Sequence, residues 1–380
     1  MKAIDRLDAH LNSRLPGLLE ARAQGRKVIG YSAGGYMPEE LVIACKAIPL
    51  GLVQAGDSDL LDAARSYICR WMDPFWRSQA GLLATGSDPY YNMLDLLVIP
   101  VTDNHCRLFS NTVQYYFPDV ESFLFGVPHT KDASALAYYL SGIHRLRKKL
   151  EDFTGVKITD ARLRDAIDLC NRERQLFREI SRLRRDERLP FNSRDFVALH
   201  HGSFLADKTV MVDILEAFLK EAGSGGPDSE TGPRILLTGS TLARGDSGVM
   251  AHIEAAGAAV VVEEFAEGLR PYRHRIKKEG DLLAALAEGY FMDRVCPGWF
   301  RPGTERLDLL IQLARDYDAA GLIWYQLMYR ESYKVESYFF PQILEKVTGL
   351  KMLVLESEYD AMAPASMETR IETFLHTLRN

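Results

Sequence analysis

Residues 27–54, KVIGYSAGGYMPEELVIACKAIPLGLVQ, decide the fold class. The apolar runs at 27–32 and 47–54 have the length and composition of buried strands, and each lies near a glycine or a proline. Between them, Pro38 opens a helical stretch whose first turn carries two glutamates, which suits the positive end of a helix dipole. A strand, a helix and a strand at this spacing predict two parallel strands joined by a right-handed crossover.

Similar apolar runs occur on both sides of a long charged segment. Further strands are expected at 96–101, 122–127, 234–239, 258–264, 321–327 and 351–356. The charged segment, from 133 to about 186, has apolar residues at helical spacing on one face. Its run RLRRDER at 182–188 is interpreted as a solvated helix face. We therefore predict an α/β protein with two lobes, each a doubly wound parallel sheet, and a helical segment between them.

The strand and helix patterns, together with a glycine-rich stretch, predict how the chain is divided into domains. Residues 222–233, AGSGGPDSETGP, have the composition of a linker or flexible loop. The expected parts are an N-terminal helix at 1–25, a first α/β lobe at 26–132, the helical segment at 133–221 and a second α/β lobe at 234–380.

The overall composition excludes several classes of protein. Hydrophobic residues make up 47% and charged residues 26% of the chain, as in globular proteins with sizeable cores. The net charge of −6 argues against a broad nucleic-acid surface. The first 24 residues are charged throughout, unlike a signal peptide, and no run approaches the roughly 18 apolar residues of a membrane helix. We expect a cytoplasmic protein that binds neither nucleic acid nor membrane.

The five cysteines are widely scattered and form no C-x-x-C pair, so reduced thiols are expected rather than a disulfide scaffold. By sequence alone each is more often a small buried hydrophobic residue than a metal ligand. Cys69, Cys106 and Cys296 nevertheless fall where loops could face an interlobe cleft. Three thiolates from separate loops can hold an iron–sulfur cluster and leave one iron open to substrate.

A glycine-rich turn, SAGGY at 32–36, follows the first strand and opens onto a helix. Ser32, Gly34 and Gly35 are therefore candidate contacts for a ligand carbonyl or anion, although the turn could equally be structural. The chain lacks G-x-G-x-x-G, the P-loop spacing and G-x-S-x-G, which leaves dinucleotide binding, ATP hydrolysis and a nucleophile elbow without support. The adjacent pair His200 and His201 is a weak metal candidate, because neighbouring side chains rarely converge on one ion.

Four segments, in order along the chain, resemble one known family. They are VIGYSAGGYMPEELVIACKAIPLGL at 28–52, LEDFTGVKITDARLRDAIDLCNRERQLFREISRLR at 150–184, LVLESEY at 353–359 and METRIETFLHTL at 367–378. They are similar to the 2-hydroxyacyl-CoA dehydratases and ATP-dependent benzoyl-CoA reductases. That resemblance implies paired related subunits, each usually holding a [4Fe-4S] cluster through three cysteines. It also implies a separate ATPase whose own cluster delivers a low-potential electron to a CoA thioester carbonyl, forming a ketyl radical.

The resemblance carries over to the cysteines only in part. Cys69, in SYICRWMD, matches the first ligand of the family. The second normally stands in T-C-D after a strand, whereas VIPVTDNHC places Asp103 directly after Thr102 and the cysteine at Cys106. The third normally follows a strand of the second lobe, where LMYRES has Arg330 instead. A guanidinium stays protonated and cannot ligate iron.

We therefore expect a subunit of an iron–sulfur-dependent acyl-CoA dehydratase or aryl-CoA reductase complex, with an altered or missing [4Fe-4S] cluster. The implied partners are a homologous cluster-bearing subunit, an ATP-dependent activator with its own iron–sulfur cluster, and an acyl-CoA or aryl-CoA substrate. Arg330 would join the glycine turn as a substrate-binding cation, paired with Glu331 or a CoA phosphate, and the helical segment would help to pair subunits.

Two alternatives remain open on the residues alone. The chain could be an active cluster subunit that uses Cys69, Cys106 and Cys296 as metal ligands. It could instead be a non-catalytic structural or assembly subunit that pairs with a cluster-bearing homologue. No catalytic residue is assigned from the sequence.

Overall fold

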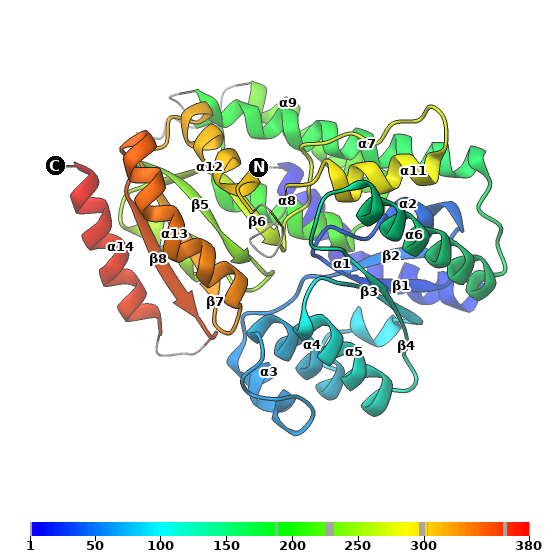
Figure 1. Cartoon of the computed structure of the whole chain (residues 1–380). Coiled ribbons are helices and arrows are strands. Elements are labelled where there is room, and N and C mark those ends of the chain that lie inside the picture. Colours follow the sequence, from blue (N-terminus) through cyan, green and yellow to red (C-terminus); the bar gives the residue numbers. More distant parts are fainter. Residues whose placement is uncertain are drawn as a thin grey trace.

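The computed structural model describes residues 2–186, 189–224, 232–295, 301, 303–359 and 363–379. It contains two four-stranded parallel sheets, one in each lobe, with helices packed around both (Figure 1). The strand orders are β2-β1-β3-β4 and β6-β5-β7-β8, so both sheets place their first strand in the interior. The predicted α/β fold with two parallel-sheet lobes is confirmed.

The strands lie close to their predicted positions. In the first sheet they are β1 (Val28–Ser32), β2 (Ile48–Leu52), β3 (Leu96–Val101) and β4 (Glu121–Gly126). In the second sheet they are β5 (Arg234–Thr241), β6 (Ala259–Glu267), β7 (Gly321–Leu327) and β8 (Met352–Ser357). The first three strands of each sheet are almost wholly buried, as expected for parallel strands covered on both faces.

Helices connect the strands and form the segment between the lobes. Those before the segment are α1 (Lys2–Ala23), α2 (Glu39–Ala44), α3 (Ser58–Ala63), α4 (Pro74–Thr85) and α5 (Asn104–Tyr116). The segment contains α6 (Ala133–Thr154), α7 (Asp160–Arg182), α8 (Ser193–Leu205) and α9 (Lys208–Gly223). Those after it are α10 (Gly248–Ala255), α11 (Leu282–Ala287), α12 (Glu305–Asp316), α13 (Glu331–Thr348) and α14 (Ala363–Arg379). No helix in the described part of the chain is long and apolar enough to cross a membrane.

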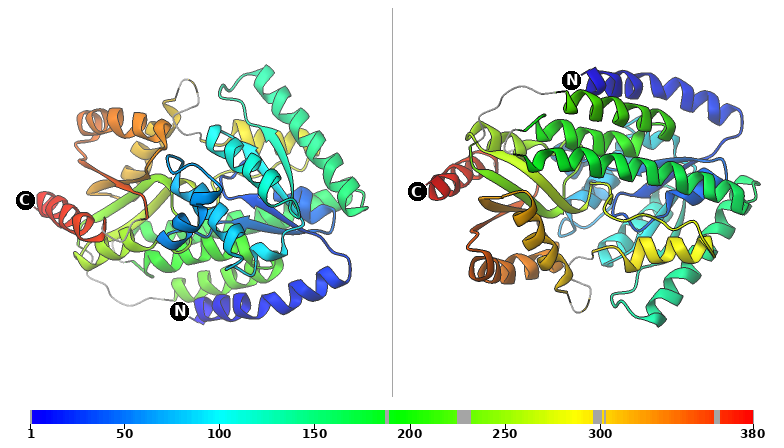
Figure 2. Two further views of the ribbon diagram at one scale, coloured as in Figure 1. Left: turned by 90° about the horizontal axis from the view of Figure 1, so that it is seen from below. Right: turned by 90° about the horizontal axis from the view of Figure 1, so that it is seen from above.

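The lobes are interleaved rather than strung in sequence. After β6 the chain crosses back to the first lobe, where α11 packs against α6 and α7 (Figure 1). The N-terminal helix α1 packs along α8 and α9, on the side of the molecule away from α13 (Figure 2). Residues distant in sequence therefore meet at the boundary between the lobes.

One basic residue of the charged run corrects the prediction of a solvated face. Arg184 is fully buried, and its guanidinium donates to both carboxylate oxygens of Glu263 on β6, at 2.6 and 2.7 Å. The same guanidinium lies 4.2 Å from the ring centre of Phe196. Arg182 and Arg185 are exposed as predicted. The prediction was wrong for Arg184 because its buried partner lies on a strand of the second lobe.

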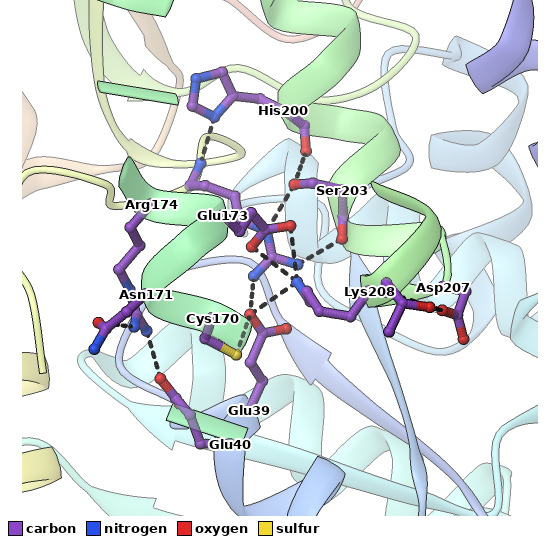
Figure 3. Close-up of polar contacts among 12 residues, drawn as sticks. Glu39, Glu40, Cys170, Asn171, Glu173, Arg174, His200, Ser203, Asp207 and Lys208 are labelled. Carbon is purple, nitrogen blue, oxygen red and sulfur yellow. Dashed lines mark hydrogen bonds and ion pairs between the residues drawn. The ribbon is translucent and has the colours of Figure 1, made fainter. Parts of the chain in front are cut away.

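The two glutamates of the PEEL sequence are also buried, in a network that ties α2 to the helical segment (Figure 3). Glu39 accepts from Lys208 Nζ at 3.0 Å and from Arg270 Nη1 at 2.5 Å. Lys208 also donates to both carboxylate oxygens of Glu173, at 3.0 and 2.9 Å. Burial favours a raised pKa for Glu39, but Arg270 and Lys208 outweigh burial and lower its pKa to about 2.

The second glutamate has its own partners. Glu40 accepts from Arg174 on α7 at 2.6 Å and from the hydroxyl of Tyr290 at 2.8 Å. Arg174 in turn contacts the Tyr290 hydroxyl at 2.7 Å. Because these groups come from α2, α7 and the segment after α11, the network holds the first lobe, the helical segment and the returning chain in one arrangement.

Candidate functional site between the lobes

Segments that follow strands of both sheets meet around Arg330, which lies between β7 and α13 and is 2% exposed. Its Nη1 lies 2.5 Å from Asp73 Oδ2, and its Nη2 lies 3.0 Å from Glu267 Oε1 and 3.6 Å from Asp103 Oδ2. The two aspartates belong to the first lobe, whereas Glu267 ends β6 in the second. We call these four residues the Arg330 cluster; it joins the two lobes at the place where the fold class puts its ligands.

Helix capping explains how the carboxylates of the two aspartates are oriented. Asp73 is the N-cap of α4, and its Oδ1 accepts from the backbone N–H of Phe75 at 2.9 Å. Asp103 is the N-cap of α5, and its Oδ1 accepts from the backbone N–H groups of His105 and Cys106. Each carboxylate therefore uses one oxygen to cap a helix and turns the other towards Arg330.

The cluster holds three carboxyl groups against one guanidinium. Glu267 Oε2 also accepts from Thr241 Oγ1 at 3.0 Å. Burial raises the pKa of Glu267, and Asp73 and Asp103 add to this effect, while Arg330 opposes it; the net direction is upward. For Asp103 the balance is reversed, since Arg330 outweighs burial and lowers its pKa. Of these two carboxyl groups, Glu267 is therefore the better placed to hold a proton.

Arg330 itself remains a cation. Burial disfavours its charge, but Glu267, Asp73 and Asp103 outweigh burial and raise its pKa well above the ordinary value. The partner expected from the sequence, Glu331, instead has a side chain that is 78% exposed and lies 3.8 Å from His105 Nε2. The expected ion pair between Arg330 and Glu331 is therefore wrong. The guanidinium of Arg330 pairs instead with buried carboxylates of both lobes.

The glycine turn after β1 packs against the second lobe. Ser32 is buried at the end of β1, and a Cβ at Gly34 would lie 3.6 Å from the Glu267 side chain. Gly35 has a φ of +72°, and its carbonyl accepts from Arg294 Nη1 at 3.1 Å. The positive φ favours glycine, and a Cβ there would lie 2.0 Å from that nitrogen unless the Arg294 side chain moved. The structure thus brings Gly34 and Arg330 together around Glu267, whereas Gly35 contacts Arg294.

The three candidate cysteines lie in different surroundings. Cys106 is buried in the first turn of α5, with its Sγ 3.4 Å from Thr102 Oγ1. Burial, then Asp103 and Glu267, raise the pKa of the Cys106 thiol well above its ordinary value, which keeps it protonated. Cys69 is exposed in the segment before α4. Cys296 lies outside the described residues.

These residues do not fit an ordinary [4Fe-4S] cluster. Such a cluster is held by thiolates, but Arg330 stands where the resemblance places the third ligand, and Cys106 is a buried thiol. Within the part of the chain that the structure describes, no group of three or more histidine, cysteine or acidic side chains is arranged to hold a metal ion.

A pocket of about 520 Å³ opens beside Asp103, beyond the carboxyl ends of β3 and β4. Its wall includes Arg107 and Tyr138, both exposed, and His129, whose Nε2 lies 2.6 Å from the Thr102 carbonyl oxygen. The volume falls within the range of about 300–1,000 Å³ that is typical of small-molecule sites. The sequence analysis missed these residues; the one signal available was that they follow two neighbouring parallel strands.

The histidine pair does not form a metal site. His200 Nδ1 accepts from the backbone N–H of Arg270 at 3.0 Å, while His201 Nε2 lies 3.0 Å from the carbonyl oxygen of Leu242. The two rings therefore have separate partners. Burial lowers the pKa of His201 to about 4, so that ring is neutral at pH 7.

Comparison with known proteins decides the family. The family model described as 2-hydroxyglutaryl-CoA dehydratase, D-component, matches residues 35–378. The chain belongs to this family. Membership in the dehydratase family confirms the resemblance inferred from the four sequence segments. The matched residues span both lobes and the helical segment.

Several named members of the dehydratase family are similar to the chain over most of its length. A putative dehydratase subunit of Escherichia coli K12 is 25% identical, covering 90% of this chain and 89% of the relative. The (R)-phenyllactyl-CoA dehydratase beta subunit of Clostridium sporogenes is 24% identical, covering 93% and 92%. A benzoyl-CoA reductase subunit of Thauera aromatica is 26% identical, covering 71% and 69%. The chain is thus a subunit of the dehydratase and reductase type.

Proposed function

We propose that this chain is the subunit without an ordinary cluster in an acyl-CoA dehydratase or aryl-CoA reductase complex. The observation that carries the proposal is Arg330, a buried cation in the position of the third cluster cysteine, held by Asp73, Asp103 and Glu267. Its partners would be a homologous subunit that bears a [4Fe-4S] cluster and an ATP-dependent activator with its own iron–sulfur cluster. Electron transfer to the thioester carbonyl would take place on the partner.

The contribution of this chain would be to bind and orient the CoA thioester. The pocket beside Asp103 supports this role, because it combines a guanidinium at Arg107, an aromatic ring at Tyr138 and an apolar wall at Val101 and Val127. An arginine suits the phosphates of CoA, and an aromatic face suits the adenine or acyl group. The guanidinium, the aromatic ring and the apolar wall of this pocket support the binding of a CoA thioester there.

Binding of CoA to the purified chain tests the substrate role. We expect isothermal calorimetry to show saturable binding of CoA, weakened about tenfold in Arg107→Ala because a charge-assisted contact is lost. Arg145→Ala, an exposed arginine on α6 outside the pocket, is the matched control and should bind like the wild type. Equal binding by both variants would remove the pocket from the proposal.

The complex tests the function as a whole. Co-expression with a family subunit that carries all three cluster cysteines, together with an activator, should give CoA-thioester dehydration or ring reduction that requires ATP and this chain. A partner that is fully active without this chain would favour the alternative of a structural subunit. The buried Arg330 cluster is compatible with that alternative, so the activity measurement decides between them.

A further inference from the structure

Arg14 on α1 is a buried guanidinium that lacks a close partner. Its side chain is 8% exposed, and its Nη1 lies 4.0 Å from Asp207 Oδ2, which is beyond hydrogen-bond range. Its Nε is buried as well and has no hydrogen-bond partner among the residues that the structure describes. Buried polar groups in folded proteins are normally hydrogen-bonded, so an arginine in this state calls for an explanation.

The electrostatic balance at Arg14 differs from that at the buried arginines described above. Carboxylates raise the pKa of Arg184 and the pKa of Arg330, although burial lowers both. Burial, the largest effect, also lowers the pKa of Arg14, but there the attraction of Asp207 does not offset it. Arg26 lies close enough to lower the pKa of Arg14 further. The charge of this buried cation is therefore only partly balanced by the protein.

Arg14 lines a pocket of about 410 Å³ between α1, the start of β2 and the turn that joins α8 to α9. That volume falls within the range of about 300–1,000 Å³ that is typical of small-molecule sites. Ile48 and Pro49, the first residues of β2, form part of its wall. The pocket therefore lies at the amino ends of the strands of the first sheet. It is separate from the pocket beside Asp103, which lies beyond the carboxyl ends of β3 and β4.

The wall of this pocket has a charged side and an apolar side. Arg14 and Arg26, which is exposed, stand on the charged side with Asp207, the one acidic residue among the described lining residues. One oxygen of Asp207 already accepts from the backbone N–H of Thr209 at 3.0 Å and caps α9. The apolar side includes Leu18, Ile43, Ile48, Pro49 and Leu169.

The other two basic residues of the wall add little free positive charge. Lys208 Nζ donates to Glu39 and Glu173, at 3.0 and 2.9 Å, so its charge is used inside the protein (Figure 3). His10 Nε2 accepts from the backbone N–H of Asp207 at 3.1 Å. Burial lowers the pKa of His10, so its ring is neutral at pH 7. The cations available to a ligand are the two guanidinium groups.

Two guanidinium groups beside an apolar wall suit an organic anion. The planar fork of arginine donors matches the oxygens of phosphate and of carboxylate. A phosphate monoester has three terminal oxygens and can accept from two guanidinium groups at once, whereas a carboxylate has only two oxygens. The charged side of the wall therefore favours a phosphate, and the apolar side favours an apolar body attached to it.

We propose that this pocket binds a small organic phosphate monoester, with its phosphate on Arg14 and Arg26 and its apolar body against Ile48 and Leu169. The phosphate supplies the hydrogen-bond acceptors that the described protein does not offer to Arg14 Nε. The ligand also joins α1 to the start of α9, alongside which α1 packs, and so stabilises that packing (Figure 2). The site is independent of the proposed role in CoA-thioester chemistry.

Phenyl phosphate is the probe that tests the site, because it joins a phosphate monoester to a small apolar body. We expect calorimetry on the full chain to show saturable binding, at least tenfold tighter than the binding of benzoate. Arg14→Met should weaken the binding of phenyl phosphate at least tenfold, because charge-assisted hydrogen bonds are lost. Arg26→Gln should weaken it as well, and its position is exposed, so the core is undisturbed. Arg6→Met, an exposed arginine on α1 outside the pocket, is the matched control and should bind like the wild type.

Thermal unfolding separates a ligand site from a structural arginine. Without ligand, Arg14→Met should be at least as stable as the wild type, because an apolar side chain replaces a poorly balanced buried charge. Phenyl phosphate should raise the unfolding temperature of the wild type and leave that of Arg14→Met unchanged. A wild-type chain that does not bind phenyl phosphate, with an Arg14→Met variant that unfolds at lower temperature, would make Arg14 structural and overturn the proposal.

The remaining outcomes identify the ligand. Equal binding of phenyl phosphate by the wild type and Arg14→Met overturns the site, and binding of benzoate as tight as that of phenyl phosphate overturns the assignment to a phosphate. CoA carries a phosphate monoester of its own, at the 3′ position. Displacement of phenyl phosphate by CoA but not by dephospho-CoA supports the site with CoA as the source of the phosphate. Binding that neither compound displaces supports the site with a separate phosphate ester as its ligand.

Discussion

At the scale of single residues, Arg330 shows what sequence reasoning captured and what it missed. The position was identified as the place of a missing cluster cysteine. Its partners were not, since Asp73, Asp103 and Glu267 are far from it in sequence. Each aspartate looks like an ordinary helix cap, and nothing in the sequence reveals that the second carboxylate oxygen faces an arginine of the other lobe.

Removal of the Arg330 guanidinium should reveal the free-energy cost of burying three carboxyl groups in one site without a cation. We expect Arg330→Met to lower the free energy of unfolding by about 3–5 kcal/mol at pH 8, because breaking a buried pair leaves uncompensated charge. The loss should shrink at pH 5, because Glu267, whose pKa is raised by burial and which no longer faces the Arg330 cation in the variant, takes up a proton. Arg185→Met, which removes an exposed pair with Asp316, is the control and should cost under about 1 kcal/mol. Urea unfolding measures both, and a loss under about 1 kcal/mol for Arg330→Met would contradict the cluster.

At the scale of elements, hydrophobic runs located the strands well, because buried parallel strands leave a continuous apolar signal. Strands β3 and β7 have the predicted bounds. The apolar period within α13 is clear only from residue 337, whereas the helix begins at Glu331. Its first turns carry Glu336, a charged residue on the inner face that pairs with the buried Arg306 at 2.8 Å. An inward-facing charge breaks the apolar period, so the pattern alone could not show that the helix begins earlier.

The buried end of α2 gives a pH dependence whose sign follows from Glu39. Its pKa is lowered from 4.5 to about 2 in the folded protein, so its contribution to stability is complete above about pH 4.5. That contribution, on the order of 3 kcal/mol, is lost as the pH falls from about 4.5 towards 2. We expect Glu39→Gln to be destabilised at pH 6 and to lose less stability than the wild type between pH 5 and pH 3. Glu216→Gln, which removes an exposed carboxylate, is the control for urea titrations at each pH. Parallel losses in Glu39→Gln and the wild type would contradict this assignment.

At the scale of the whole molecule, the two-lobed α/β architecture and the family were both predictable from the sequence. The parallel arrangement of β1 and β2 was predicted, but the full strand order was not, because it also depends on the pairing of β1 with the distant β3. The residues that meet between the lobes were not predictable for the same reason. The candidate site lies where the two lobes meet, which explains why the Arg330 cluster and the pocket beside Asp103 emerged only from the structure. The fold places a buried salt bridge at Arg330, where the family resemblance implies a cluster ligand in other members and where we expected an altered or missing cluster in this chain.

We propose that this chain occupies the place of a cluster subunit without holding an ordinary cluster. Iron and acid-labile sulfide, measured on the chain purified without oxygen and again after reconstitution with iron and sulfide, test it most directly. We expect less than about one iron per chain in both samples, while a co-purified partner with three cluster cysteines holds about four. About four irons and four sulfides in the isolated chain would contradict it.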